Sequence, residues 1–134
     1  MTLLQLHLMI VCVWLGMVLT ETVLEFSARD APARRAVAVA HHWIDVLLEI
    51  PILIALVATG ALLLARAWPA PPLLLFKVAA GLVAVGANVI CFPLVHRRWQ
   101  ARDDARASVL TRQIKLTITA FPFAVAAMVI GLGY

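Results

Sequence analysis

The chain has 134 residues, of which 64% are hydrophobic and 13% charged, with a formal net charge of +4. A soluble domain of this size has too little interior to bury so much apolar side chain, so the composition excludes an ordinary soluble fold and indicates a protein that lies in a lipid bilayer. Nucleic acid is not expected as a partner, because the arginines flank apolar segments and no aromatic surface accompanies them.

Four apolar segments are present, at residues 3–25, 41–65, 73–95 and 115–132. Each is close to the ~20 residues that cross a hydrocarbon core of about 30 Å. Since backbone groups in lipid must be satisfied within a helix, we predict an all-α, polytopic four-transmembrane-helix bundle in a single domain, residues 1–134. No basic residue precedes the first segment, so we expect a retained helix rather than a signal peptide.

Arginine is concentrated after the first and third segments, at Arg29, Arg34, Arg35, Arg97, Arg98, Arg102, Arg106 and Arg112. Basic loops favour the cytoplasmic side. We therefore expect both basic loops in the cytoplasm and both termini outside, in a bacterial inner membrane.

The first segment carries His7, Trp14, Glu21 and Glu25 on a single stripe, within about 40° of His7 on a helix. A charge at the bilayer centre costs at least ~2.5 kcal/mol even on the lenient insertion scale, so this stripe is expected to face the bundle interior.

The second segment opens with His41, His42, Asp45 and Glu49, which fall within about 100° of one another. Four polar groups on one face of a lipid-compatible helix indicate a site rather than a surface. Pro51 removes a backbone donor and predicts a kink just beyond Glu49.

The third segment places small residues between two polar ones, along the stripe Lys77, Gly81, Ala84, Asn88 and Cys91. Small side chains let helices approach closely. The fourth segment ends in a plain apolar stretch.

Because the first two helices run antiparallel, their acidic and histidine residues are expected to meet in the cytoplasmic half of the bundle. Imidazole and carboxylate together suit a divalent transition metal such as iron, zinc, manganese or copper(II), and helix bundles hold such ligands on facing helices. The predicted metal ligands are Glu21, Glu25, His41, His42, Asp45 and Glu49.

The same residues have other uses. Glu21, Asp45 and Glu49 would also suit a charge network with Lys115 or Arg97 that fixes helix packing, or a proton path. His7 and Lys77 form a second, outer pair, in which His7 suits an interfacial hydrogen bond and Lys77 suits snorkelling to the headgroups.

Residues 7–16 (HLMIVCVWLG), Thr59-Gly60 and residues 73–82 (LLLFKVAAGL) resemble the helices of CopD/HemJ-like membrane proteins. The resemblance implies a four-helix membrane protein linked to copper uptake or to haem-dependent protoporphyrinogen oxidation. It further implies haem b as cofactor, with His7 as a ligand and Lys77 as second ligand or propionate partner. The inner carboxylates and histidines are additions to that pattern.

The sequence thus predicts an integral membrane metalloprotein with a redox-linked site. As an enzyme it would be an oxidoreductase acting on a small lipid-soluble substrate. Two alternatives stay open. One is a haem-b protein using His7. The other is a metal-ion or proton-coupled transporter, which would need a homodimer because one four-helix chain seldom encloses a path; Pro51 and Pro93 would supply its bends.

Overall fold

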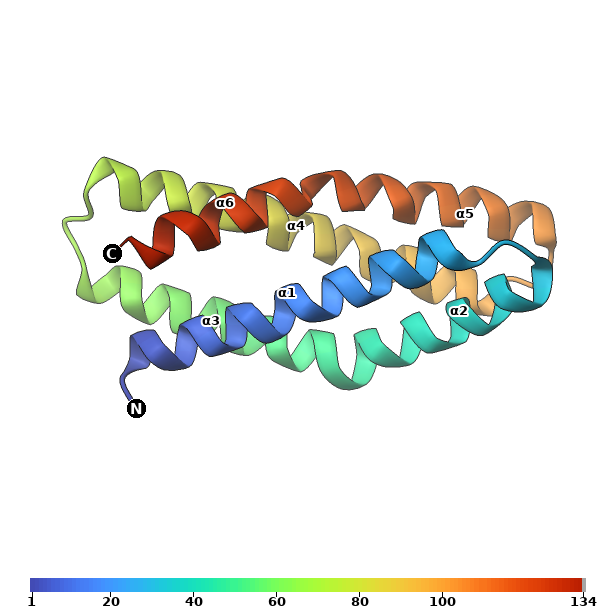
Figure 1. Ribbon diagram of the computed structural model, residues 1–134, viewed down its shortest axis with the longest axis horizontal. Coiled ribbons are helices and arrows are strands. Elements are labelled where there is room, and N and C mark those ends of the chain that lie inside the picture. The colour runs from blue at the N-terminus through green and yellow to red at the C-terminus, as the bar shows by residue number, and fades with distance from the viewer. Residues whose placement is uncertain (134) are drawn as a thin grey trace.

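The computed structural model describes residues 1–133, which are built of helices with no strand in that range (Figure 1). The elements follow one another as α1 (Leu3–Ser27), α2 (Ala31–Ile44), the π-helix η1 (Asp45–Glu49), α3 (Ile50–Arg66), α4 (Pro72–Gln100), α5 (Asp104–Thr117), the 3-10 turn η2 (Ile118–Ala120) and α6 (Phe121–Leu132).

Within residues 1–133, four helical spans are long and apolar enough to cross a membrane, Leu3–Ser27, Ala31–Arg66, Pro72–Gln100 and Asp104–Leu132. This confirms the predicted all-α architecture with four helices long and apolar enough to span a membrane. In the bundle α1 packs beside α3, α2 packs beside α4, and α4 packs beside α5 and α6 (Figure 1). Large apolar side chains such as Leu19, Phe26, Leu47 and Ile54 are exposed on the outside, where lipid would cover them.

Three spans extend well beyond their predicted bounds at the same end of the bundle, while the first ends at Ser27, two residues past its prediction. The second span begins at Ala31, ten residues before residue 41, and the third ends at Gln100. The fourth begins at Asp104. Asp30 and Asp103 cap the new helix starts, accepting hydrogen bonds from Ala33 N (2.8 Å) and Ala105 N (3.1 Å). Hydropathy detects only the part of a helix that is apolar enough for lipid. The predicted spans therefore did not include these polar helical turns.

The end of the bundle at which these spans are extended is called the arginine-rich end. It consists of the connections at residues 28–30 and 101–103 and the helix ends that flank them. The connection at residues 67–71 and the N-terminus lie at the opposite end (Figure 1). The span Ala31–Arg66 has 36 residues. By helix rise it is about 54 Å long, more than the ~40–45 Å of a bilayer with its headgroups. The span is therefore longer than the membrane is thick, and the polar first turns of α2 are the part that would lie in the headgroup layer.

The second span contains a π-helical turn where the sequence predicts a kink. Ile50 N–H donates to the carbonyl of Asp45, five residues earlier. Pro51 has no N–H, and its ring would clash with the carbonyl of Leu47 in a regular α-helix, which accounts for the wider turn there. In a regular helix Glu49 would lie about 80° round from His41. The π turn reduces this angle, because it contains more residues per turn than an α-helix. Both His41 and Glu49 are buried.

Candidate metal centre

A column of ionisable groups runs through the half of the bundle nearer the arginine-rich end. The stripe predicted on α1 is buried, as are the histidines and acids of α2 and η1. The buried polar residues of this column are Glu21, Glu25, His41, His42, Asp45, Glu49 and Arg98. They come from α1, α2, η1 and α4, so tertiary packing assembles the group.

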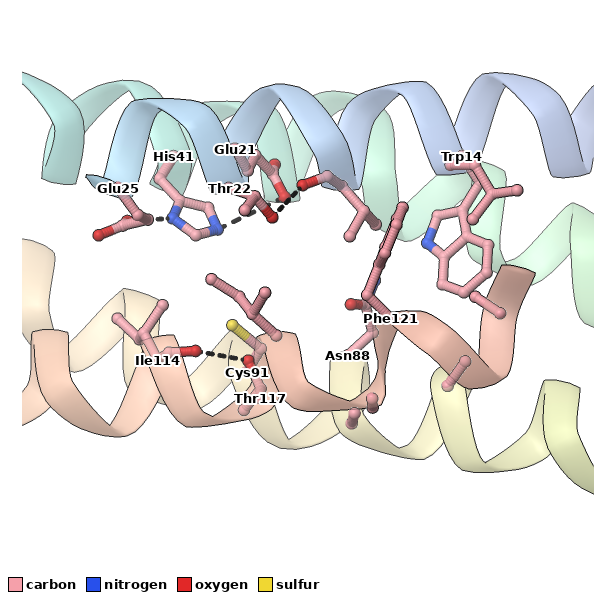
Figure 2. Close-up of a pocket in the computed structure, with 17 residues that line it drawn as sticks. Trp14, Glu21, Thr22, Glu25, His41, Asn88, Cys91, Ile114, Thr117 and Phe121 are labelled. Carbon is pink, nitrogen blue, oxygen red and sulfur yellow. Dashed lines mark hydrogen bonds and ion pairs between the residues drawn. The ribbon is translucent and has the colours of Figure 1, made fainter. Parts of the chain in front are cut away.

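Glu25 of α1 contacts side chains of two other helices, Arg98 of α4 and His41 of α2. Its Oε2 and Oε1 accept from the two terminal nitrogens of Arg98, at 2.7 Å and 2.5 Å, in a two-pronged pair. Its Oε1 also lies 2.6 Å from Nδ1 of His41 (Figure 2). Because a paired carboxylate can only accept, Nδ1 of His41 carries the proton. The lone pair of a neutral His41 is therefore on Nε2.

That Nε2 atom points at further carboxyl groups. Glu21 Oε2 lies 3.5 Å from it and Asp45 Oδ1 lies 3.7 Å from it. Asp45 is only 3% exposed and Glu21 only 6%. Across residues 1–133, both oxygens of Asp45 and Oε1 of Glu21 lack a hydrogen-bond partner. An unsatisfied buried oxygen costs about 1–3 kcal/mol, so a proton, a cation or a bound water would stabilise this arrangement.

The spacing of these atoms suits a metal ion. One ligand atom each from Glu21, His41 and Asp45 lie within 4.8 Å of one another. Ligands at about 2.0–2.2 Å from a tetrahedral ion are about 3.3–3.6 Å apart. The distance from His41 Nε2 to Glu21 Oε2 (3.5 Å) falls in this range, and the distance to Asp45 Oδ1 (3.7 Å) lies just above it. Glu25 would orient the histidine from behind, as carboxylates do for metal-bound imidazoles.

Glu49 lies one turn beyond Asp45 and has its own partners. Its Oε1 accepts from Trp14 Nε1 at 3.1 Å and also from Asn88 Nδ2. The side chain is 2% exposed. Of the predicted ligands, Glu49 thus sits at the apolar edge of the cluster, with one oxygen already engaged by two donors.

The two adjacent histidines have separate environments. His42 stacks on Trp99, with ring centroids 4.2 Å apart and planes at 11°, and His96 lies 5.2 Å away. It faces α4 instead of the carboxylates, because neighbouring residues on a helix point about 100° apart. The structure therefore brings Glu21, His41 and Asp45 together, with Glu25 behind, and places His42 in an aromatic cluster with Trp43, His96 and Trp99.

A cavity of about 40 Å³ opens beside the cluster. Its walls are α1 and α2 on one side and α4, α5, η2 and α6 on the other (Figure 2). Glu21 and His41 line it, and so do the Cys91 thiol and Asn88. At about 10–15 Å³ per water, it has room for roughly three water-sized groups.

The predicted outer pair lies at the other end. His7 Nδ1 is 2.8 Å from Thr59 Oγ1, whose own proton is directed at the carbonyl of Ala55, also at 2.8 Å. His7 Nδ1 is therefore the donor, which leaves the lone pair on Nε2. Lys77 packs against Gly131, where an added Cβ would come within 2.8 Å of its Nζ.

Arg98 is the functional residue that sequence reasoning missed. The predicted cations were Lys115 and Arg97, but Lys115 lies over the Phe26 ring at 4.7 Å, and Arg98 is the cation that pairs with Glu25. A signal was present. Continuing the stripe from Cys91 by four and then three residues reaches Val95 and Arg98, both buried. The predicted helix ended too early to include it.

Comparison of the chain with protein-family models, with curated proteins and with solved structures finds no match.

Proposed function

We propose that this chain is an integral membrane metalloprotein that holds a divalent transition metal between Glu21, His41 and Asp45. The observation that carries the proposal is that Nε2 of His41 lies 3.5 Å from Glu21 Oε2 and 3.7 Å from Asp45 Oδ1. In this group both oxygens of Asp45, and the other oxygen of Glu21, have no hydrogen-bond partner within residues 1–133. Among the buried residues of that part of the chain there are four carboxyl groups, those of Glu21, Glu25, Asp45 and Glu49, and one guanidinium, that of Arg98, which pairs with Glu25. A divalent cation would offset much of the remaining negative charge.

Three protein ligands beside a cavity favour a working metal site over a structural one, because structural sites are closed by four. A water or small substrate would complete the coordination from the cavity. Iron, manganese or copper there would support redox chemistry, whereas zinc would support hydrolysis. The small cavity restricts the ligand that reaches the metal to a few heavy atoms.

Metal analysis of protein purified without chelators tests the proposal. Wild type is expected to contain a stoichiometric amount of one transition metal, and Asp45→Asn and Glu21→Gln are expected to lose it. Asp104→Asn, an exposed acid outside the cluster, is the matched control and should keep the metal. Metal-free wild type, or equal metal in all variants, would refute the site and leave a shared proton as the explanation of the cluster.

A haem-b protein using His7 is the second candidate. It is favoured by the hydrogen bond to Thr59, which leaves Nε2 of His7 free to bind iron. The absorption spectrum of protein from haem-replete cells separates the two candidates. A Soret band that disappears in His7→Ala but persists in Asp45→Asn would favour haem, and a colourless preparation that contains metal would favour the inner site.

A further inference from the structure

A second cavity, of about 70 Å³, lies at the arginine-rich end between α2, α4 and α5. Its polar lining is mostly cationic or hydroxylic, with one acid: Arg34, Arg35, Arg98, Ser108, Thr111 and Asp104. Arg98 is the residue that this cavity shares with the cluster around His41. The carboxylate of Glu25 neutralises the charge of Arg98. The remaining charged residues of the lining are two cations, Arg34 and Arg35, and one anion, Asp104, so the cavity has a net positive charge.

The two exposed arginines are held at the wall by carbonyl groups. Arg35 Nη1 donates to the carbonyl of Ala101 at 3.2 Å, and Arg34 Nη1 donates to the carbonyl of Arg29 at 2.9 Å. A guanidinium carries five N–H donors, so a single anchored nitrogen leaves most of them for a ligand. Both side chains are thus positioned before anything binds.

Arg98 connects this cavity to the pair that it forms with Glu25. The residue is only 3% exposed, and its terminal nitrogens are paired with Glu25. Its Nε is buried and has no hydrogen-bond partner in the described part of the chain. A buried donor left unpaired costs about 1–3 kcal/mol. Nη1 of the same guanidinium lies 3.4 Å from Oγ1 of Thr111, so this buried cation borders a hydroxyl group of the cavity wall.

Size and depth indicate the ligand. The volume accommodates roughly five water-sized groups, which suits the central atom and four oxygens of a phosphate. Guanidinium groups bind phosphate through paired N–H donors, and basic pockets between membrane helices bind lipid headgroups. The polar first turns of α2 are the part of the second span that would lie in the headgroup layer. We propose that this cavity binds a phosphate group, carried by an anionic phospholipid or present as free phosphate.

The test is the thermal unfolding of the full chain in a maltoside detergent. The probes are dioctanoyl-phosphatidylglycerol, dioctanoylglycerol as its phosphate-free counterpart, and inorganic phosphate against chloride at equal ionic strength. We expect saturable stabilisation by a phosphate-bearing probe and none by dioctanoylglycerol. Saturation by the lipid alone assigns a headgroup, and saturation by inorganic phosphate alone assigns the free ion.

Charge variants test the site itself. Arg34→Gln and Arg35→Gln should each weaken the apparent affinity by about tenfold, since each removes a charge-assisted hydrogen bond. Arg102→Gln removes the same charge at the same end, outside the lining, and should bind as wild type does. Asp104→Asn should bind more tightly. Unsaturable stabilisation, an equal response to dioctanoylglycerol, or wild-type affinity in both Arg34→Gln and Arg35→Gln would overturn the proposal.

Discussion

The carboxylate of Glu25 accepts hydrogen bonds from both terminal nitrogens of Arg98, although the two residues lie 73 positions apart in the chain. The same carboxylate lies 2.6 Å from Nδ1 of His41. One side chain therefore fixes the end of α1 against α4 and also sets which nitrogen of His41 faces Glu21 and Asp45. Helix packing and the chemistry of the candidate metal centre depend on one pair.

Loss of Arg98 should destabilise the bundle. Arg98→Ala leaves the buried carboxylate of Glu25 without its cation, and breaking a buried pair from one side costs about 3–5 kcal/mol. Reversible unfolding in mixed micelles would measure this. Arg97→Ala, an exposed neighbour on α4, should change stability by less than about 0.5 kcal/mol. Equal effects of the two variants would show that the Glu25–Arg98 pair contributes no net stability.

Glu25→Gln should weaken metal binding without removing a ligand. The amide still accepts from His41 Nδ1 but no longer makes the imidazole more basic, and changes of this kind typically cost 10–100-fold in metal affinity. Competition with a chelator of known affinity, on variant protein shown to be folded, gives the number. Wild-type affinity would restrict Glu25 to a packing role.

Pro51→Ala should disturb the candidate metal centre from outside it. Alanine restores the N–H that Pro51 lacks and lets the second span close into a regular α-helix, which turns Glu49 and α3 relative to Asp45 and His41. We expect lower metal occupancy with little loss of helicity, measured by metal analysis and circular dichroism. Pro93→Ala, in the interior of α4, is the matched control and should retain the metal.

Gly60→Ala should destabilise the contact between α1 and α3. A Cβ at Gly60 would lie 3.3 Å from Cε1 of His7, which Thr59 holds in place. Overpacking of this kind costs about 1–3 kcal/mol. Gly86→Ala, where nothing lies within 4 Å, should be neutral or stabilising by up to about 1 kcal/mol. Melting temperatures of the two variants in one detergent make the comparison, and a fall in Gly86→Ala as large as in Gly60→Ala would contradict it.

Periodicity alone predicted which face of α1 is buried. His7, Trp14, Glu21 and Glu25 fall on one stripe because a helix repeats every 3.6 residues, and a polar stripe on an apolar helix has no stable place except the interior. The same argument, applied to overall composition, predicted the helical membrane-spanning bundle. These features are local, so one segment of sequence contains the information that decides them.

Tertiary structure decided the rest. Periodicity placed His41 and His42 about 100° apart but could not say which one faces α1, and the packing of α2 against α4 puts His41 among the carboxylates and His42 on Trp99. Helix packing also makes Arg98 the partner of Glu25. Arg98 lies in a polar helix end, which hydropathy does not detect. The π turn before Pro51 then changed the direction of Glu49 about the helix axis relative to His41. Each outcome depends on distances between helices, which arise only when the spans pack together.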